Sequence, residues 1–490
     1  MNRRRIILGG IVWMMGGQLL SWSLRLVEAA VVPRILGAHG VGVVGYVGTL
    51  FAVIGLLTMF GGPEQIIRSV AADCQRGAVI ATHMLVARLL LLPPILAIVY
   101  FGSRWAFRSN PSVLILIPIG LIVAFLQPIG EVLLAWRQAH NQFGVAARTQ
   151  MAAQSASLPT SIALVATGFG TRGAAWGAAV YQIVLVAAVW IQKNNPIRFA
   201  AITLNGFRMM FSECKPYLRY NLFLWLYGSS TSVLFISLLG SYTAIGWYLL
   251  AGKLLGVIFV IPMTTLQAVT PTLTDAYVRA RHEFESLAPR FVNLIMALSV
   301  LFGAVLFLRA DSLLRVMHYP RSLYPAAILI RVMGLGLWMR WTGVCYGSLL
   351  VITGNADLRA KAATVATPYN LLSTPLYVLL CGRFLHNAAL GAVIATETTE
   401  ILIVALYIRH LHRPEMVRRN LAVTARALAA VVAPVILLKL APTPNLVAFI
   451  AVSALAALAY IPAAMLTGAL PREAMTMLQN AARSRAVVEA

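Results

Sequence analysis

The segment ILGAHGVGVVGYV, residues 35–47, has a counterpart in the second half of the chain, LLGSYTAIGWYLL at residues 238–250. With one gap, the Leu-Gly pair and a later tyrosine of the first segment align with those of the second. A second pair of similar segments follows, GAAWGAAVYQI at 173–183 and NAALGAVIATE at 387–397. We call these two pairs of similar segments the first and the second anchor. Because both occur in the same order, they predict an internal repeat of two similar halves. Chance similarity among Ala/Gly-rich helices is the alternative.

These anchors lie in a chain that is too apolar to fold in water. Of its 490 residues, 60% are hydrophobic and 11% are charged, whereas a soluble domain carries about 25% charged residues. Apolar stretches long enough to cross a bilayer recur along the chain. The sequence therefore predicts an all-α polytopic membrane protein with about fourteen transmembrane helices. The weakest predicted spans are 145–168 and 217–239, which polar residues dilute.

The repeat groups these helices into two six-helix bundles, followed by two extra helices. Because six is even, the bundles share an orientation, and a pseudo-twofold axis along the membrane normal relates them. Two such halves around a midplane cavity form a transporter that alternates between inward-open and outward-open states, although the same axis also allows a channel or a scaffold. The predicted parts are an N-terminal bundle at 1–193, a cytoplasmic linker at 194–216, a C-terminal bundle at 217–410, two extra helices at 421–467 and a cytoplasmic tail at 468–490.

The net charge of +24 would suggest a nucleic-acid partner for a soluble protein. Here most Lys and Arg residues fall in segments that a cytoplasmic N-terminus would place inside, as the positive-inside rule requires. The charge is therefore explained by topology. The sequence predicts a multi-pass membrane protein with both termini in the cytoplasm and no nucleic-acid partner.

Enzymatic classes lack their sequence signatures. The motif GxxxxGK[ST] is absent, and the longest internal segment outside the predicted spans, 194–216, is too short for a nucleotide-binding domain. No outer loop is large enough for the catalytic loop of a membrane-embedded glycan polymerase or ligase. The four cysteines are scattered without metal-site spacing. We therefore expect neither an enzyme nor a cofactor, with H+ and Na+ as candidate coupling ions.

Ionisable side chains occur inside the predicted spans, where a charge at the helix centre disfavours insertion by about 2.5–3.5 kcal/mol. Such groups usually face a cavity or a partner. By position along each span they are Arg88, Lys253, Arg340, Glu397 and Glu400 near the midplane, Arg25, Glu28 and Arg331 in the outer half, and Glu131 in the inner half.

Some of these charges also have a purely structural interpretation. Arg25 and Glu28 are three residues apart on one helix and could neutralise each other. Arg88 precedes Pro93 and Pro94, and an arginine could satisfy backbone carbonyls that prolines leave without a donor.

Helical spacing separates the two arginines of a later span. Arg331 and Arg340 are nine residues apart, close to half a turn at about 100° per residue. They cannot both face one cavity on a straight helix, and Arg340 is the favoured one.

The repeat is broken at two charged positions. Lys253 aligns with Phe51 under the first anchor, and Glu397 aligns with Ile183 under the second. The fold that both halves share does not require a charge that only one half carries. Such a charge therefore indicates a role in function.

Glu397 and Glu400, in the segment ATETTEIL, share one face of a helix. Two carboxylates about a turn apart in a poorly hydrated site cannot both ionise easily, which suits proton or cation coupling. A salt bridge from Lys253 or Arg340 is the alternative.

Two stretches resemble polysaccharide flippases of the multidrug/oligosaccharidyl-lipid/polysaccharide (MOP) exporter superfamily. VVPRILGAHGVGVVGYVGTLFAVIGLL, residues 31–57, is similar to their arginine–Leu-Gly turn after the first span, here with Gly45-Tyr46 after an inserted VGVV. LLGSYTAIGWYLLAGKLLGVIFVIPMTTLQAVTPTLTDAY, residues 238–277, is similar to the corresponding pattern of their second half. The resemblance covers nearly the whole chain.

The resemblance implies that the protein moves an undecaprenyl-pyrophosphate-linked oligosaccharide from the inner to the outer leaflet of a bacterial cytoplasmic membrane, for surface or exopolysaccharide synthesis. A pyrophosphate needs cationic donors inside a low-dielectric passage. The candidates for this clamp are Arg25, Arg88, Lys253 and Arg340. The candidates for the polar lining and for coupling are Glu28, Glu397, Glu400 and Arg331. Expected partners are the lipid-linked oligosaccharide, membrane lipids, a polysaccharide polymerase and a chain-length regulator.

Other functions stay open at this point. An ion-coupled multidrug or small-molecule antiporter of the same superfamily would need a cavity dominated by acidic and aromatic groups, and a lipid II flippase would carry a related substrate. A non-transporting role, in which basic loops such as RHLHRPEMVRR at residues 409–419 recruit synthesis enzymes, is a further alternative.

Overall fold

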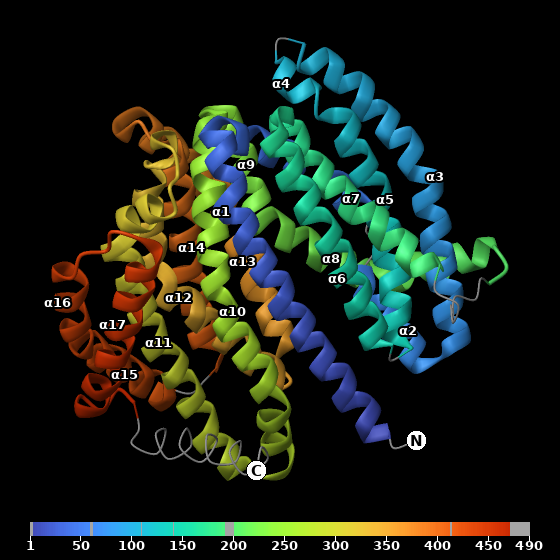
Figure 1. The fold of residues 1–490 in the computed structure, drawn as a ribbon. Helices are drawn as coiled ribbons and strands as arrows, with labels where there is room; N and C mark the ends of the chain where they lie inside the picture. The colour runs from blue at the N-terminus through green and yellow to red at the C-terminus, as the bar shows by residue number, and fades with distance from the viewer. Residues whose placement is uncertain are drawn as a thin grey trace, which may run out of the picture. The chain divides into compact units, whose positions relative to one another are not determined.

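The fold comes from a computed structural model that describes residues 3–58, 62–108, 110–140, 142–191, 200–411 and 414–470. Within these residues every regular element is a helix (Figure 1). Ten helical segments of this described part are long and apolar enough to cross a membrane. The predicted all-α polytopic fold is therefore confirmed.

The chain divides into two compact units, Met1–Leu250 and Ala251–Ala490, with the division inside one helix. The domain boundaries at 193 and 217 stay predictions. The helices up to that division are α1 (Arg3–Leu57), α2 (Gly62–Ala72), α3 (Cys74–Ala106), α4 (Pro111–Leu114), α5 (Ile117–Ala139), α6 (Phe143–Leu164), α7 (Gly170–Ile191), α8 (Leu204–Tyr227), α9 (Ser229–Leu239) and α10 (Tyr242–Arg279). Those after it are α11 (Arg281–Val316), α12 (Ala326–Ile352), α13 (Ala356–Leu385), α14 (Ala388–Leu411), α15 (Pro414–Ala430), α16 (Val432–Leu440) and α17 (Leu446–Leu466).

The helix α1 contains the first segment of the first anchor, residues 35–47, and is broken within it at Gly37. This glycine has φ 64° and ψ −177°, values outside the helical region. A positive φ is accessible to glycine without a steric penalty. Pro33, one turn earlier, also removes a backbone donor. The break therefore turns one continuous helical run into two segments.

The two weak predicted spans form helices of different kinds. The span at 145–168 corresponds to α6, which continues into a π-helical turn, Val165–Phe169, before α7. The span at 217–239 is divided between α8 and α9 at Gly228, whose backbone is extended. Polar residues therefore weakened the sequence signal of the first without preventing a long helix, whereas the second is interrupted.

The two segments of the first sequence anchor contact each other in the structure. A Cβ atom on Gly42 would collide with the carbonyl oxygen of Tyr242, and one on Gly246 would collide with that of Ala38. Residues 38 and 42 thus meet residues 246 and 242 crosswise, as a local twofold relation between two similar segments requires. The glycines have a physical role here, because only their lack of a side chain allows this approach.

We expect Gly42→Ala to lower the free energy of unfolding by about 1–3 kcal/mol, because the added methyl group meets rigid backbone. Gly48→Ala is the matched control on the same helix, since a Cβ atom there meets nothing within 4 Å. Thermal unfolding of both variants in detergent would test the contact. Equal melting temperatures for the two variants would contradict it.

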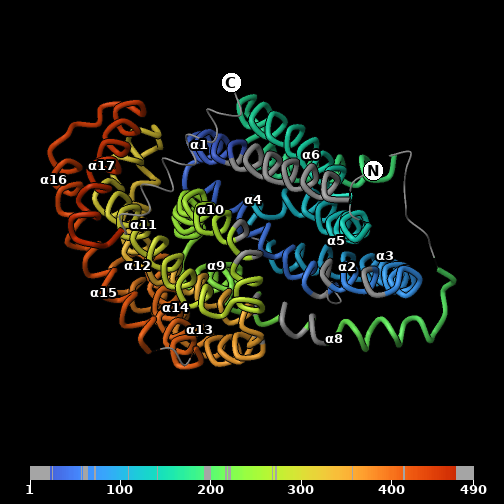
Figure 2. Tube along the Cα trace, turned by 90° about the horizontal axis from the view of Figure 1, so that it is seen from below, coloured from blue at the N-terminus to red at the C-terminus, as the bar shows by residue number. Residues whose placement is uncertain are grey.

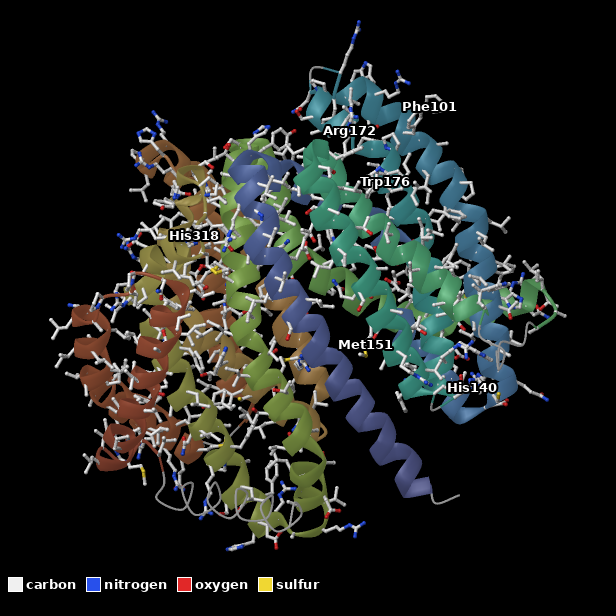
Figure 3. All side chains as sticks on the ribbon, in the orientation of Figure 1. Phe101, His140, Met151, Arg172, Trp176 and His318 are labelled. Carbon is white, nitrogen blue, oxygen red and sulfur yellow. The ribbon has the colours of Figure 1, made fainter. Side chains whose placement is uncertain are left out.

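The outer surfaces of the helices carry large apolar side chains. Phe101 in α3 is 70% exposed and Trp176 in α7 is 36% exposed (Figure 3). In a membrane protein such surfaces face lipid, so their exposure fits the apolar composition.

The C-terminal helices pack on α11. Both views place α15, α16 and α17 beside it (Figures 1 and 2). Tyr460 of α17 donates a hydrogen bond to the carbonyl oxygen of Ala297 in α11, at 2.8 Å. Around this bond Val300, Ala427 and Ala464 are among the buried residues of one apolar cluster.

Candidate functional site

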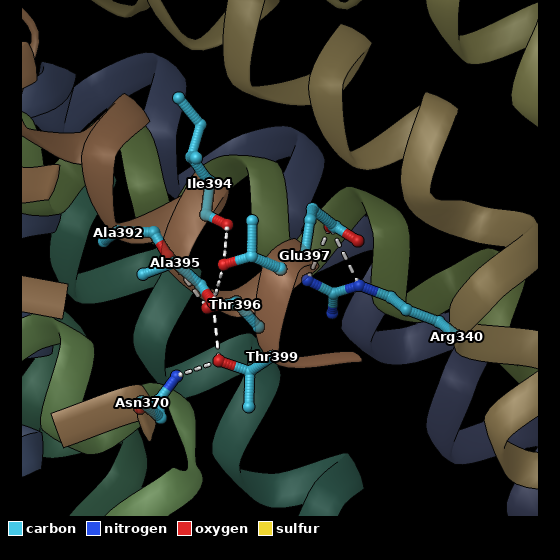
Figure 4. Close-up of polar contacts among 9 residues, drawn as sticks. Arg340, Asn370, Ala392, Ile394, Ala395, Thr396, Glu397 and Thr399 are labelled. Carbon is cyan, nitrogen blue, oxygen red and sulfur yellow. Dashed lines mark hydrogen bonds and ion pairs between the residues drawn. The ribbon is translucent and has the colours of Figure 1, made fainter. Parts of the chain in front are cut away.

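A buried ion pair joins α12 to α14 (Figure 4). The Nη2 and Nε atoms of Arg340 lie 2.8 and 3.0 Å from Oε1 of Glu397. The two side chains are only 17% and 10% exposed. The sequence left two partners open for Glu397, and the structure selects Arg340.

The approach of Glu397 to α12 depends on a glycine. A Cβ atom on Gly336, one turn before Arg340, would collide with the carboxylate of Glu397. Gly343 lies one turn after Arg340, and a Cβ atom on it would lie 3.4 Å from Oε2 of Glu400. Small residues at this spacing let both carboxylates of α14 lie against the backbone of α12.

The pair leaves one carboxylate oxygen without a partner. Oε2 of Glu397 is buried and has no hydrogen-bond partner among the residues that the structure describes. An unpaired buried acceptor is unfavourable by about 1–3 kcal/mol, and by more when it is charged. A proton, a cation or a donor from another molecule would relieve this cost.

A neutral polar network holds the opposite side of α14 against α13 (Figure 4). Asn370 donates to the hydroxyl oxygen of Thr399 at 3.0 Å, and Thr399 donates to the carbonyl oxygen of Ala395 at 2.6 Å. Asn370 and Thr399 are completely buried. The network fixes the rotation of α14 and thereby the direction of Glu397. Sequence reasoning missed it, although the threonine-rich run TETT was a signal.

The corresponding interface of the first half carries Ile183 at the position that aligns with Glu397. In the predicted repeat, α5 and α7 correspond to α12 and α14. Gly130 of α5 faces α7, where Leu185, Val186 and Oε1 of Gln182 lie 2.7, 3.4 and 3.9 Å from the position of a Cβ atom. Ile183, which aligns with Glu397, is 42% exposed. The ion pair is therefore a feature of the second half alone.

Arg88 lies in a second buried cluster, in α3. Its Nε donates to the carbonyl oxygen of Thr58 at 2.9 Å, and its Nη1 donates to that of Pro128. Oε2 of Glu131 lies 3.8 Å from Nη1. The Thr58 carbonyl follows the last residue of α1, where helical carbonyls lack a partner. Arg88, which is 0% exposed, thus joins α1, α3 and α5. The carbonyl groups that it binds, those of Thr58 and Pro128, are not the ones before Pro93.

Arg331 and Arg340 contact different neighbours, as their spacing predicts. Arg331 forms an ion pair with Asp311 of α11, whereas Arg340 pairs with α14. The side chain of Lys253 in α10 is exposed. Of the predicted clamp residues, Arg88 belongs to the first unit, and Lys253 and Arg340 belong to the second.

The remaining predicted residues lie on α1 and α14. Glu28 and Glu400 are half-buried, and the side chain of Arg25 lies outside the described residues. The roles of all eight residues in substrate binding and coupling stay predictions.

Solved structures with a similar fold are membrane transporters. The chain resembles a structure titled "Lipid II flippase MurJ, inward closed conformation", with a TM-score of 0.71 and 12% identity over 94% of this chain and 98% of that one. It also resembles an inward-facing multidrug resistance MATE family transporter of the MOP superfamily, with a TM-score of 0.56 and 16% identity over 80% and 94%. A MOP superfamily transporter from Pyrococcus furiosus gives a TM-score of 0.52 and 14% identity over 83% and 96%. At these identities the likeness shows the fold.

A search of curated protein sequences gave no match. A family model does match, over residues 7–277, and it describes a polysaccharide biosynthesis protein. The matched region is more than half of the chain and includes both segments of the first anchor. The chain, with the fold of MOP superfamily transporters, therefore belongs to the polysaccharide biosynthesis protein family.

Proposed function

We propose that this protein is a flippase of a bacterial cytoplasmic membrane. It moves an undecaprenyl-pyrophosphate-linked oligosaccharide from the inner to the outer leaflet by alternating access, for surface or exopolysaccharide synthesis, with both termini in the cytoplasm. A polysaccharide polymerase and a chain-length regulator would act on its product. The observation that carries the proposal is the Arg340–Glu397 pair, buried between apolar helices in a polysaccharide biosynthesis protein.

The geometry of the pair suggests how an anionic head group binds. In the closed pair the carboxylate of Glu397 neutralises Arg340 through two nitrogens. A pyrophosphate offers the guanidinium several oxygens and more negative charge than one carboxylate. The substrate would therefore replace Glu397 on Arg340.

The displaced carboxylate supplies a route to coupling. Once Arg340 has moved to the substrate, Glu397 is a buried charge without its counter-ion, which is unfavourable by several kcal/mol. Uptake of a proton or Na+ would remove that cost, and its release would restore the pair. Binding of the substrate and of the coupling ion would then favour each other.

A second candidate substrate is lipid II. The fold is similar to that of a solved lipid II flippase over nearly the full length of both chains. Lipid II and the proposed substrate share a polyprenyl pyrophosphate and differ in the group attached to it. The same Arg340 chemistry would serve both.

Reconstitution into liposomes tests the proposal. A labelled undecaprenyl-pyrophosphate oligosaccharide is incorporated, and a membrane-impermeant reagent reports how fast the label reaches the outer leaflet. We expect flipping with the wild type and with Arg279→Ala, which removes an exposed pair with Asp275, and none in protein-free liposomes. Unlabelled lipid II and a lipophilic organic cation serve as competitors.

Each competitor tests one alternative function. Preferential transport of lipid II would replace the proposed substrate by the second candidate. Efflux of the organic cation without movement of any lipid-linked pyrophosphate would identify an antiporter instead and would overturn the flippase.

A further inference from the structure

A basic cavity lies apart from the buried ion pairs, at one end of α11, α15 and α17. Its volume is about 650 Å³. α11 contributes residues near its start, α15 contributes its first three turns, and the chain just after α17 closes one side. The charged and polar residues that line it are Arg290, Asn293, Glu415, Arg418, Arg419 and Arg426.

The cavity concentrates positive charge. Four arginines and one glutamate line it, a balance of 4 − 1 = +3. Arginines gathered around one void repel one another, and an anion inside the void removes that repulsion. The guanidinium group matches phosphate oxygens with two parallel N–H groups. The lining therefore selects a phosphate-bearing ligand.

The side chain of Asn293 adds a second requirement, a hydrogen-bond donor on the ligand. Its side chain is 6% exposed, and its Oδ1 atom has no hydrogen-bond partner within the described part of the chain. An amide oxygen accepts hydrogen bonds and cannot bind a phosphate oxygen directly. A ligand that carries a hydroxyl group beside its phosphate would satisfy both the arginines and Asn293.

The surroundings of the cavity are those of a membrane. α11, α15 with α16, and α17 are among the segments apolar enough to span a bilayer. On α15, Leu421 and Leu428 are 51% and 57% exposed, and they lie two turns apart on one outer face. Acyl chains can lie along such a face while a polar head group enters the cavity.

We propose that this cavity binds the glycerophosphate head group of an anionic phospholipid, of the phosphatidylglycerol or cardiolipin type. Basic pockets between transmembrane helices at the cytoplasmic side bind such head groups, and the predicted topology places this end of α11, α15 and α17 in the cytoplasm. The bound lipid would join the C-terminal helices to α11. The site is independent of the proposed transport substrate.

Binding is measured on the full chain, delipidated in neutral detergent, by native mass spectrometry. The lipids are phosphatidylglycerol, phosphatidylethanolamine and phosphatidic acid, and the soluble probes are glycerol 1-phosphate and inorganic phosphate. We expect phosphatidylglycerol to bind at least about tenfold more tightly than phosphatidylethanolamine, because both carry the phosphate but the ammonium group of phosphatidylethanolamine adds a positive charge to a cavity lined by four arginines. The soluble phosphates should displace it only weakly.

Three variants separate the parts of the site. Arg418→Gln/Arg419→Gln should reduce binding of phosphatidylglycerol and phosphatidic acid alike by at least about tenfold. Asn293→Leu should lose the preference for phosphatidylglycerol over phosphatidic acid while it keeps charge-dependent binding. Arg279→Gln, at an exposed pair outside the cavity, is the control and should bind as the wild type does. Melting temperatures without lipid verify that each variant folds.

Two results would overturn the proposal. Equal retention of phosphatidylglycerol and phosphatidylethanolamine by folded wild type would exclude an anionic head-group site. Displacement of phosphatidylglycerol by inorganic phosphate at equal concentration would make the cavity a site for soluble anions. Neither result depends on whether the protein transports a lipid-linked oligosaccharide.

Discussion

Arg340→Ala is expected to lower the free energy of unfolding by about 3–5 kcal/mol, because it leaves the buried carboxylate of Glu397 without its counter-ion. Oε2 of Glu397 already lacks a partner in the described structure, so the truncation would leave both oxygens unpaired. The loss would appear as a lower melting temperature in detergent. Arg279→Ala, whose side chain is 79% exposed in a pair with Asp275, should change stability by less than about 1 kcal/mol.

Replacing both partners should reverse most of this loss. Arg340→Met with Glu397→Leu fills the space with apolar groups of similar size, and such replacements of buried ion pairs are often neutral or stabilising. The double variant should therefore melt near the wild-type temperature. If Arg340→Ala and Arg279→Ala have the same melting temperature, the Arg340–Glu397 pair contributes nothing to the packing of α12 on α14. The described geometry is then not the stable one.

Arg88→Met should produce a loss of several kcal/mol in the first unit. It leaves the carbonyl oxygens of Thr58 and Pro128 without this donor and removes the cation beside Glu131, and each buried acceptor without a donor is unfavourable by about 1–3 kcal/mol. The stability of Arg88→Lys should lie between those of Arg88→Met and the wild type, since one ammonium group cannot reproduce the several donors of the guanidinium group. Thermal unfolding of the three proteins measures the order.

Arg104→Met is the matched control for Arg88. Arg104 lies on the same helix, is exposed, and donates to the hydroxyl of Tyr100 at 3.2 Å. Its loss should have little effect on stability. Indistinguishable melting curves for the Arg88 and Arg104 variants would show that Arg88 does not hold α1, α3 and α5 together.

The helical fold could be predicted from the sequence because hydrocarbon restricts the chain to a few structures. Apolar stretches of spanning length must be helices there, since every backbone group needs an internal partner. The repeat located the two segments of the first anchor, but the contact of Gly42 with Tyr242 comes from the structure. Helical spacing likewise separated Arg331 from Arg340, which contact different helices.

Partners across helices could not be predicted in the same way. Periodicity tells which face a residue occupies and not which helix lies opposite. The structural interpretation of Arg88 placed its partners near Pro93, but Arg88 contacts Thr58 and Pro128. The bond between Asn370 and Thr399 had no sequence signal beyond polar residues in two apolar helices.

The basic cavity was missed for a related reason. Arg290 and Arg418 are far apart in the sequence, where Arg418 belongs to the basic loop at residues 409–419. The packing of α15 on α11 brings them to one cavity. A charge that topology explains can therefore also serve binding.

The most direct measurement is the flipping rate of labelled undecaprenyl-pyrophosphate oligosaccharide in liposomes that contain the Arg340→Met/Glu397→Leu protein. This variant should fold as the wild type does, so its rate reports the function of the ion pair apart from stability. We predict a rate at least about tenfold below the wild type, because charged hydrogen bonds to the pyrophosphate are lost. A folded double variant that flips the lipid at the wild-type rate would contradict the role of Arg340 and Glu397 in transport.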